Sequence, residues 1–546
     1  MPPSSKQKKK IQLLIPMSGS GSRFRSAGYQ EPKPLIPVSG VPMIERVLDL
    51  FPWDWPCTFV LSSDHRDTDL AKLLADLRPS SKILWIDEKE RYKSPFKGPA
   101  LAVYMGAKTL DPSLPVLVSY CDYGMIWDAR HFERFVGYSD CDACLVSYRG
   151  FHAHYLSPTM YAYSRINNEL VRAVREKGCF TSNRETEYAS AGAYYFKSSK
   201  QLQDALEWQV EDKLEVQNEH YVSLAIEAML KRMPQSAVRV FEIPKFCQWG
   251  TPDDLKTFEY WEKTFTSWNK LLGDPSSYEV SQILMPMAGH GSRFQNLSDK
   301  PKPFLKIGDK AMFELALDSL PTSPATVVVA LDDHRRHLEE IPSRDIPVIA
   351  HLLSKTPPGQ ALSTEQGLSK LDKAKEVIVS ACDHEIVLCR DKWRRFRAAP
   401  NCDAAIFTIQ GFPGAKRRPN AFAYVVPVKG DNPFPEVTSV SVKQPVSSSP
   451  SDDHLLVGTF WFKQVKVLAE YLDLLKARNL TVNGELYLDS IFTVMIEHGL
   501  KVRMITLDGY ICRGDPDSLA ESVYFQELFG GRSLSINGRF IPKGSQ

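Results

Sequence analysis

A glycine-rich segment with two cations near the start of the chain could bind phosphate. It reads Gly19-Ser-Gly-Ser-Arg-Phe24 and is followed by Pro32-Lys33-Pro34. Glycines let backbone N–H groups approach a phosphate closely, arginine offers it a bidentate fork, and lysine offers a point charge. The flanking prolines restrict the backbone and lower the cost of aiming the lysine. The predicted phosphate-binding residues are Gly19, Gly21, Ser22, Arg23 and Lys33.

The same constellation occurs a second time. Gly289-His-Gly-Ser-Arg-Phe294 is followed by Pro301-Lys302-Pro303. Neither copy matches the dinucleotide-binding fingerprint, because phenylalanine replaces its third glycine, and no Gly-Lys-Ser/Thr of a P-loop follows. A pair of solvated surface cations is the alternative interpretation, and the repetition counts against it. The second set of candidates is Gly289, Gly291, Ser292, Arg293 and Lys302.

Further segments recur in the same order, about 265 residues apart. The pairs are Val116–Asp122 with Val377–Asp383, Gly192–Phe196 with Gly458–Phe462, and Gly250–Leu255 with Gly514–Leu519. A period this long exceeds that of solenoid repeats, so each copy is expected to have its own core. We predict a basic N-terminal tail (1–10), a first domain (11–272), a linker (273–281), a second domain (282–532) and a C-terminal tail (533–546).

Short apolar runs alternate with amphipathic segments in each copy. The predicted strands of the first copy are Ile11–Met17, Cys57–Leu61, Lys82–Asp87 and Val116–Tyr120. The predicted helices are Met43–Phe51, Asp67–Leu77, Ala100–Leu110 and, at the end of the copy, Asp253–Leu272. This alternation indicates an α/β fold with a mostly parallel, mixed sheet flanked by helices. Ligands in such folds bind at the carboxyl ends of the strands, where the repeated polar motifs fall.

The composition excludes several classes of protein. Of 546 residues, 43% are hydrophobic and 24% charged, which excludes disorder over most of the chain. A net charge of +2 provides no global attraction to nucleic acid, and no apolar run approaches the ~20 residues of a membrane span. The apolar run behind the basic N-terminus is too short for a secretory signal, and ten cysteines are ordinary usage. We expect a cytoplasmic protein that binds no nucleic acid and does not span a membrane.

The motif Gly-x-Gly-Ser-Arg-Phe, followed by Pro-Lys-Pro, resembles the opening signature of the sugar-phosphate nucleotidyltransferases, the glucose-1-phosphate thymidylyltransferase-like enzymes. The resemblance covers nearly the whole chain, once per copy. It implies two tandem Rossmann-like (GT-A-like) domains. It also implies transfer of an NMP group from an NTP to a sugar 1-phosphate or phosphoalcohol, with release of pyrophosphate. In the family the loop and its arginine hold the triphosphate, and the motif lysine contacts the reacting phosphates.

The resemblance gives roles to four further residues. An Asp at the end of a buried strand binds Mg²⁺ (or Mn²⁺) in the family, and Asp122 and Asp383 occupy that position. An Asp that caps the next helix is the alternative. A second glycine motif of the family lies beside the nucleobase, and Gly98 and Gly359 match it. A plain helix start is the alternative there.

The acceptor side matches the family less evenly. A Glu-Lys motif, whose lysine binds the sugar phosphate, matches Glu176-Lys177, whereas the second copy has Val442-Lys443 and lacks the carboxylate. The other acceptor candidates are Gly192, Glu219, Gly458 and Glu485. For the two glutamates, a carboxylate on the surface of a helix is the alternative.

One departure concerns the metal. The family usually has a second metal-binding Asp before the Gly-Thr near the end of the domain, and this chain has Gln248 and Cys512 there. Glutamine can offer Mg²⁺ an oxygen, whereas cysteine is a poor ligand for a hard ion. Two alternatives therefore stay open. Either the first domain alone is catalytic and the second binds a ligand or regulates, or the chain is a nucleotide-sugar-dependent GT-A-type glycosyltransferase, which would not need the Arg–Lys loop.

Overall fold

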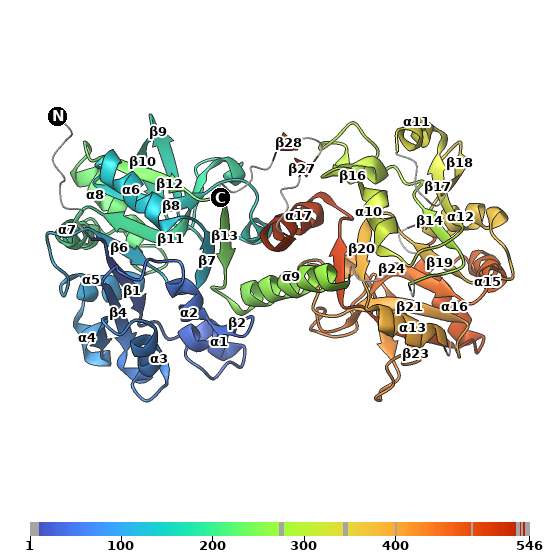
Figure 1. Ribbon diagram of the computed structural model, residues 1–546, viewed down its shortest axis with the longest axis horizontal. Helices are drawn as coiled ribbons and strands as arrows, with labels where there is room; N and C mark the ends of the chain where they lie inside the picture. Colours follow the sequence, from blue (N-terminus) through green and yellow to red (C-terminus); the bar gives the residue numbers. More distant parts are fainter. Residues whose placement is uncertain are drawn as a thin grey trace. The chain divides into compact units, whose positions relative to one another are not determined.

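The chain folds into two units, each built on one nine-stranded mixed sheet. The computed structural model describes residues 10–271, 278–341, 348–398, 401–481, 484–530, 535–536 and 539–540. In Figure 1 the first unit runs from blue to green and the second from green to red. The predicted pair of α/β domains is confirmed. None of the helices in these described ranges is long and apolar enough to cross a membrane.

The first sheet has a parallel half and a largely antiparallel half. Its strands are β1 (Gln12–Met17), β4 (Cys57–Ser62), β5 (Lys82–Ile86), β6 (Val116–Ser119), β8 (Ala143–Tyr148), β9 (Tyr163–Asn167), β10 (Leu170–Arg175), β11 (Tyr188–Phe196) and β12 (Val238–Glu242). They follow the order β10-β9-β11-β6-β1-β4-β5, and β8 pairs with β11 and β12. Every residue of β1 is buried, which explains its continuous apolar sequence.

Helices flank this sheet, and α2, α3 and α5 among them lie at the predicted places. They are α1 (Ser22–Ser26), α2 (Met43–Leu48), α3 (Leu70–Leu77), α4 (Glu88–Lys93), α5 (Pro99–Ala107), α6 (Ala129–Ser139), α7 (Ser199–Glu211) and α8 (Val222–Arg232). Helix α5 packs on β1 and β4. A Cβ at Gly106 would lie 2.5 Å from Leu14 Cδ1, so glycine permits this close approach.

The second unit repeats this topology. Its strands are β14 (Ile283–Pro286), β17 (Thr326–Leu331), β18 (Val348–Leu353), β19 (Val377–Ser380), β21 (Ala404–Ile409), β22 (Ala423–Pro427), β23 (Val437–Val442), β24 (His454–Phe462) and β25 (Val502–Thr506). Their order, β18-β17-β14-β19-β24-β21-β25, matches β5-β4-β1-β6-β11-β8-β12 strand for strand. The helices are α10 (Met312–Ser319), α11 (Arg335–Glu339), α12 (Gln360–Gly367), α13 (Arg390–Ala398), α14 (Pro413–Arg417), α15 (Val465–Arg478), α16 (Ile491–Glu497) and α17 (Pro516–Gly530).

Small antiparallel pairs complete each unit. β7 (Tyr123–Ile126) pairs with β13 (Lys245–Gln248), and β20 (His384–Val387) pairs with β26 (Gly509–Cys512). β2 (Pro37–Val38) pairs with β3 (Val41–Pro42), and β15 (Lys306–Ile307) pairs with β16 (Lys310–Ala311). Within the predicted C-terminal tail, β27 (Ser535–Ile536) pairs with β28 (Arg539–Phe540) and with β15.

The boundary between the units falls inside α9 (Pro252–Leu271), between Glu259 and Tyr260. Tyr260 Oη donates a hydrogen bond to Tyr510 O at 2.8 Å, and the Trp261 ring stacks on Phe525 at 5.7 Å. The part of the helix from Tyr260 onward therefore contributes to the core of the second unit. The predicted helix is confirmed. Most of the predicted linker, residues 273–277, lies outside the described residues.

We expect Trp261→Ala to lower the free energy of unfolding by about 3–5 kcal/mol, because the ring is 1% exposed and its removal leaves a large cavity. Urea denaturation measures the loss. Trp53→Ala is the matched control at a 68% exposed position and should change the unfolding free energy by about 0.5 kcal/mol or less. Equal losses in the two variants would contradict the burial argument.

Candidate active site

The glycine loops lie directly after the first strand of each sheet. Gly21 has a φ of 64° and Gly291 a φ of 59°, the left-handed region that favours glycine. A Cβ at Gly291 would lie 2.5 Å from Lys302 Cβ, and one at Gly21 would lie 3.5 Å from Lys33 Cβ. The glycines thus permit both the turn and the close approach of the motif lysine.

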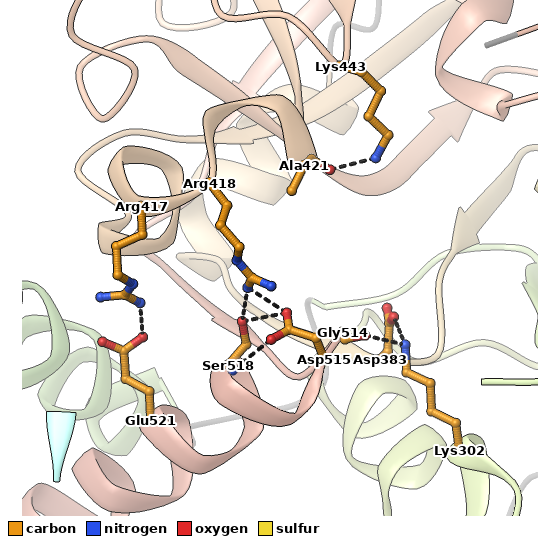
Figure 2. A network of polar contacts seen from close by, with 10 residues as sticks. All are labelled: Lys302, Asp383, Arg417, Arg418, Ala421, Lys443, Gly514, Asp515, Ser518 and Glu521. Atoms are coloured by element: carbon orange, nitrogen blue, oxygen red, sulfur yellow. Dashed lines mark hydrogen bonds and ion pairs between the residues drawn. The ribbon is translucent and has the colours of Figure 1, made fainter. Parts of the chain in front are cut away.

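Each motif lysine reaches the predicted metal-binding aspartate of its own unit. Lys33 Nζ lies 2.5 Å from Asp122 Oδ2 and donates a hydrogen bond to Gly250 O at 3.1 Å. In the second unit, Lys302 Nζ lies 2.5 Å from Asp383 Oδ2 and 2.9 Å from the carbonyl of Gly514. Figure 2 shows this second arrangement. The structure thus brings together the loop, the aspartate and the Gly-Thr motif of the sequence analysis.

The alternative role of these aspartates as helix caps is wrong. Strand β7 begins at Tyr123 and β20 begins at His384, so a strand rather than a helix follows each aspartate. Backbone bonds fix the same positions, because Trp249 N donates to Asp122 O at 3.0 Å and Arg513 N donates to Asp383 O at 2.8 Å.

Electrostatics keep the second pair ionised. Burial opposes ionisation of Asp383, but the charge of Lys302 and the neighbouring His384 outweigh it and hold the pKa of the carboxyl below its usual range. Burial likewise opposes the charge of Lys302, and Asp383 more than compensates, so the pKa of the ammonium is raised. Both groups are therefore charged at neutral pH.

Two cavities meet at this point in the first unit. One, of about 570 Å³, is lined by the glycine loop, Gly98 and Glu219. The other, of about 410 Å³, is lined by Glu176, Lys177 and Gly192 among others. Their shared lining residues are Arg23, Tyr120, Asp122, Tyr221 and Gly250. Both volumes lie in the range of small-molecule sites. The predicted nucleotide side and most of the predicted acceptor side are thus adjoining cavities with Arg23 and Asp122 at their junction. Glu219, predicted on the acceptor side, instead lines the cavity of the glycine loop.

A short segment before α8 connects the two cavities. Lys177 Nζ donates to Gln217 Oε1 at 2.7 Å and to Tyr221 Oη at 2.6 Å, and Tyr221 in turn donates to Glu219. A Cβ at Gly98 would lie 3.0 Å from Glu219 Cβ, so the glycine turn and the glutamate touch. Glu219 therefore lies in a loop of the site, and its alternative placement on a helix surface is wrong. Gln217 and Tyr221 were not predicted, although Tyr221 is two residues from a candidate.

The corresponding residues of the second unit are also close to one another. A Cβ at Gly359 would lie 2.5 Å from the carbonyl oxygen of Leu486, which follows Glu485. Lys443 Nζ donates to Ala421 O (Figure 2) and lies 5.0 Å from the centre of the Tyr487 ring. Burial and the charge of Arg293 lower the pKa of Lys443. Gly458 is the remaining candidate, and a Cβ there would lie 3.5 Å from His384 Cε1.

The residues at the missing metal-ligand position differ between the units. Gln248 Nε2 donates to Asp254 Oδ1 at 2.6 Å, and its Oε1 accepts from Tyr161 Oη at 3.1 Å. The amide is therefore part of the wall of the second cavity. At the same place in the other copy, Cys512 is buried, and burial raises the pKa of its thiol.

Sequence reasoning missed a polar cluster beside Cys512. Arg418 donates to Asp515 at 2.6 Å and to Ser518 Oγ at 2.9 Å, and Arg417 pairs with Glu521 (Figure 2). Asp515 lies in the second copy of the repeated Gly-x-Pro-Asp motif, but no local pattern connects it with the two arginines, which lie about 100 residues earlier.

We expect the stability of the protein to fall as the pH rises through the titration of Glu176. Burial raises the pKa of this carboxyl from its usual value to about 7, and Ser223 Oγ donates to it. The native state therefore binds more protons than the unfolded state between roughly pH 4.5 and 7, so stability is lost across that window. Glu176→Gln should gain about 1–3 kcal/mol relative to wild type between pH 5 and pH 8 in urea denaturation.

The control for this measurement is Glu88→Gln, at an exposed position on α4. It should follow the wild-type pH profile. A Glu176→Gln profile parallel to the wild-type profile would show that Glu176 titrates normally.

Comparison with known proteins gives a family. The family model described as "MobA-like NTP transferase domain" matches residues 13–184 and again residues 284–449. 2-C-methyl-D-erythritol 4-phosphate cytidylyltransferase of Tolumonas auensis is 37% identical over 93 residues, and this match covers 16% of the chain and 38% of that protein. The chain thus spans well under half the length of that curated relative.

Two solved structures are each similar to a little under half of the chain. A nucleoside-diphosphate-sugar pyrophosphorylase from Vibrio cholerae RC9 has a TM-score of 0.36 at 17% identity, covering 44% of this chain and 97% of its own. An inositol-1-phosphate CTP transferase from T. maritima has a TM-score of 0.35 at 12% identity, covering 45% and 97%. The family model matches both copies and more than half of the residues, so the chain belongs to the MobA-like NTP transferase family.

Proposed function

We propose that the first unit transfers an NMP group from an NTP to a sugar 1-phosphate or phosphoalcohol and releases pyrophosphate. One observation carries this proposal: two cavities adjoin, and Arg23 and Asp122 line both. A triphosphate on the glycine loop would meet the phosphate of an acceptor at this junction. Membership of the NTP transferase family supports nucleotidyl transfer as the type of reaction.

The chemistry requires alignment and charge rather than a general base. A phosphomonoester with a second pKa near 6 is largely ionised at pH 7, so its oxygen can attack the α-phosphorus without proton removal. Arg23 and Lys33 on one side, and Lys177 on the other, would neutralise and orient the reacting phosphates. The same three cations would exclude a neutral acceptor.

Asp122 is suited to hold Mg²⁺ (or Mn²⁺) together with the nucleotide. Among the described residues none donates a hydrogen bond to Asp122 Oδ1, whereas Lys33 is bound to Oδ2. One free carboxylate oxygen, completed by phosphates and waters, fits the usual coordination of Mg²⁺ better than a dedicated protein cage would. When bound, the ion would offset the negative charge that develops on the phosphates.

We assign the second unit a ligand-binding or regulatory role. It retains the loop and the Lys302–Asp383 pair. It has Val442 in place of the acceptor-side glutamate. Its Asp515, next to the Gly514 carbonyl that Lys302 contacts, is already paired with Arg418. These differences favour one catalytic copy over two.

Substitution of Lys33 or Asp122 by alanine should lower kcat for pyrophosphate release by about 10²–10³, the usual cost of losing one preorganised charge. The matched variant Lys302→Ala removes the same interaction from the second unit and should retain at least half of the wild-type rate. A near-wild-type rate in Lys33→Ala would refute the assignment. A strong loss in Lys302→Ala as well would show that both copies contribute.

Removal of divalent metal should abolish turnover. With excess EDTA we expect no pyrophosphate release, and Mg²⁺ or Mn²⁺ added beyond the chelator should restore it. Undiminished turnover in EDTA would exclude the proposed metal role of Asp122.

The substrates can be identified by assaying each of five NTPs (ATP, GTP, CTP, UTP and dTTP) with each of a set of sugar 1-phosphates and phosphoalcohols, with Mg²⁺ present. Formation of pyrophosphate shows which pairs react. A nucleotide-sugar-dependent glycosyltransferase would instead release a nucleoside diphosphate from an NDP-sugar and no pyrophosphate, so the same assay separates the two reaction types.

A further inference from the structure

Four aromatic side chains line the acceptor-side cavity of the first unit. His154 lies 4.5 Å from Tyr161 between ring centres, Tyr161 lies 5.5 Å from Phe246 edge to face, and Tyr123 lies 5.8 Å from Phe246. All four line the cavity. Burial holds the pKa of His154 well below its ordinary value, so its ring is neutral at pH 7. We call these four residues the aromatic cluster.

A partly buried carboxylate, that of Asp254, lines the same cavity. Asp254 accepts hydrogen bonds from Gln248 Nε2 and Thr251 Oγ1, each at 2.6 Å. Both partners are neutral, and no cation of the described chain lies within ion-pair distance of this carboxylate. Desolvation raises the pKa of Asp254. Desolvation makes a carboxylate without a countercharge costly, and a cationic ligand would supply the missing partner.

The neutral polar groups of this wall are already bonded to one another. Gln248 uses its NH₂ on Asp254 and its oxygen on the Tyr161 hydroxyl, while the Thr251 hydroxyl also donates to Asp254. A polyhydroxylated acceptor would find the Gln248 amide and the Thr251 hydroxyl already engaged. Aromatic faces and a carboxylate remain, which are the surfaces that recognise organic cations.

The second unit provides an internal comparison. The corresponding hairpins of the two units begin with the same pair, Ala162-Tyr163 and Ala423-Tyr424. When the copies are aligned on this pair, Arg418 occupies the position of Ser157, a residue that lines the cavity of the first unit. Arg418 forms an ion pair with Asp515 at 2.6 Å (Figure 2). In the aligned repeat, Asp515 stands at the position of Thr251 and Ser518 at that of Asp254, so the carboxylate and the hydroxyl have exchanged positions. The second unit provides its own guanidinium for its carboxylate, whereas the first unit has a serine at the position of that arginine, beside a cavity that Asp254 also lines.

We propose that the acceptor of the first unit is a phosphomonoester that carries a quaternary ammonium group, of the phosphocholine type. This rests on the proposed function and names its acceptor class. The phosphate would lie at Arg23 and Lys177, and the ammonium against the aromatic cluster beside Asp254. In the reaction an acceptor phosphate oxygen forms a bond to the α-phosphorus. The bond from that phosphorus to the α–β bridging oxygen breaks, and pyrophosphate leaves with the electron pair.

The decisive experiment compares two acceptors of equal shape on the full-length wild-type protein. Phosphocholine and 3,3-dimethylbutyl phosphate differ only in that a neutral carbon replaces the ammonium nitrogen. With each Mg-NTP we expect phosphocholine to be used with a kcat/KM at least ~10-fold higher, as contact of a cation with aromatic faces and a carboxylate implies. Equal use of the two acceptors, or turnover with glucose 1-phosphate but not with phosphocholine, would overturn the inference and leave the proposed function standing.

Calorimetric titration separates failure of the inference from failure of the proposed function. Both acceptors are titrated into the protein with each Mg-bound α,β-methylene NTP analogue, which cannot release pyrophosphate. Preferential binding of phosphocholine without pyrophosphate release from any natural NTP would uphold the cation site and overturn the proposed function. Equal affinities, or no binding of either acceptor, would overturn the cation site whatever the turnover.

Variants test which residues give rise to the preference for phosphocholine over 3,3-dimethylbutyl phosphate. Asp254→Asn and Tyr161→Leu should each reduce kcat/KM for phosphocholine by ~10-fold or more and leave that for 3,3-dimethylbutyl phosphate within about 3-fold. Phe422→Leu, at the position in the second unit that corresponds to Tyr161, is the matched control and should keep the wild-type preference. Equal losses for both acceptors in Asp254→Asn and Tyr161→Leu would show general damage to the site and overturn its role in selecting a cation.

Discussion

The contact between a lysine and an aspartate, made once in each unit, brings together three segments that are distant in the sequence. Lys33 comes from the loop after β1, Asp122 from the end of β6, and the carbonyl of Gly250 from the turn before α9. β1 and β6 are adjacent and parallel, so their carboxyl ends meet at one edge of the sheet. The ion pair thus places a cation and a carboxylate where phosphates and a metal would be needed, and the adjoining cavities follow from that placement.

The sequence predicted those features of the fold and the site that depend on a local pattern of residues. Apolar runs located β1, β4, β5 and β6 to within two residues, and the glycine turns at Gly21 and Gly98 were marked by their composition. The repeated motifs also identified Lys33 and Asp122, because two copies of one constellation in one chain are hard to explain as surface charge. The sequence could not predict contacts between segments that are distant along the chain. Nothing in the charged run around Arg418 indicates that its guanidinium meets Asp515, because that contact depends on how a loop after β21 folds toward α17.

The two copies have kept the backbone arrangement and changed the side chains that would recognise a ligand. Strand order and the lysine–aspartate pair are the same in both. Around them, Tyr161 and Asp254 of the first unit line a cavity, whereas Arg418 and Asp515 of the second unit form an ion pair with each other. The lysine–aspartate framework is therefore the same in the two copies, whereas the residues around it differ.

Helix α9 has a further consequence for the history of the duplication. Asp254, in its first turn, lines a cavity of the first unit, whereas Trp261 and Phe265, two and three turns later, are buried in the second unit. Deletion of the leading copy at the point where the repeat ends would remove two aromatic side chains from the interior of the trailing one. The second copy would therefore have to replace these two buried side chains before it could fold without the first copy, which makes the fusion difficult to reverse.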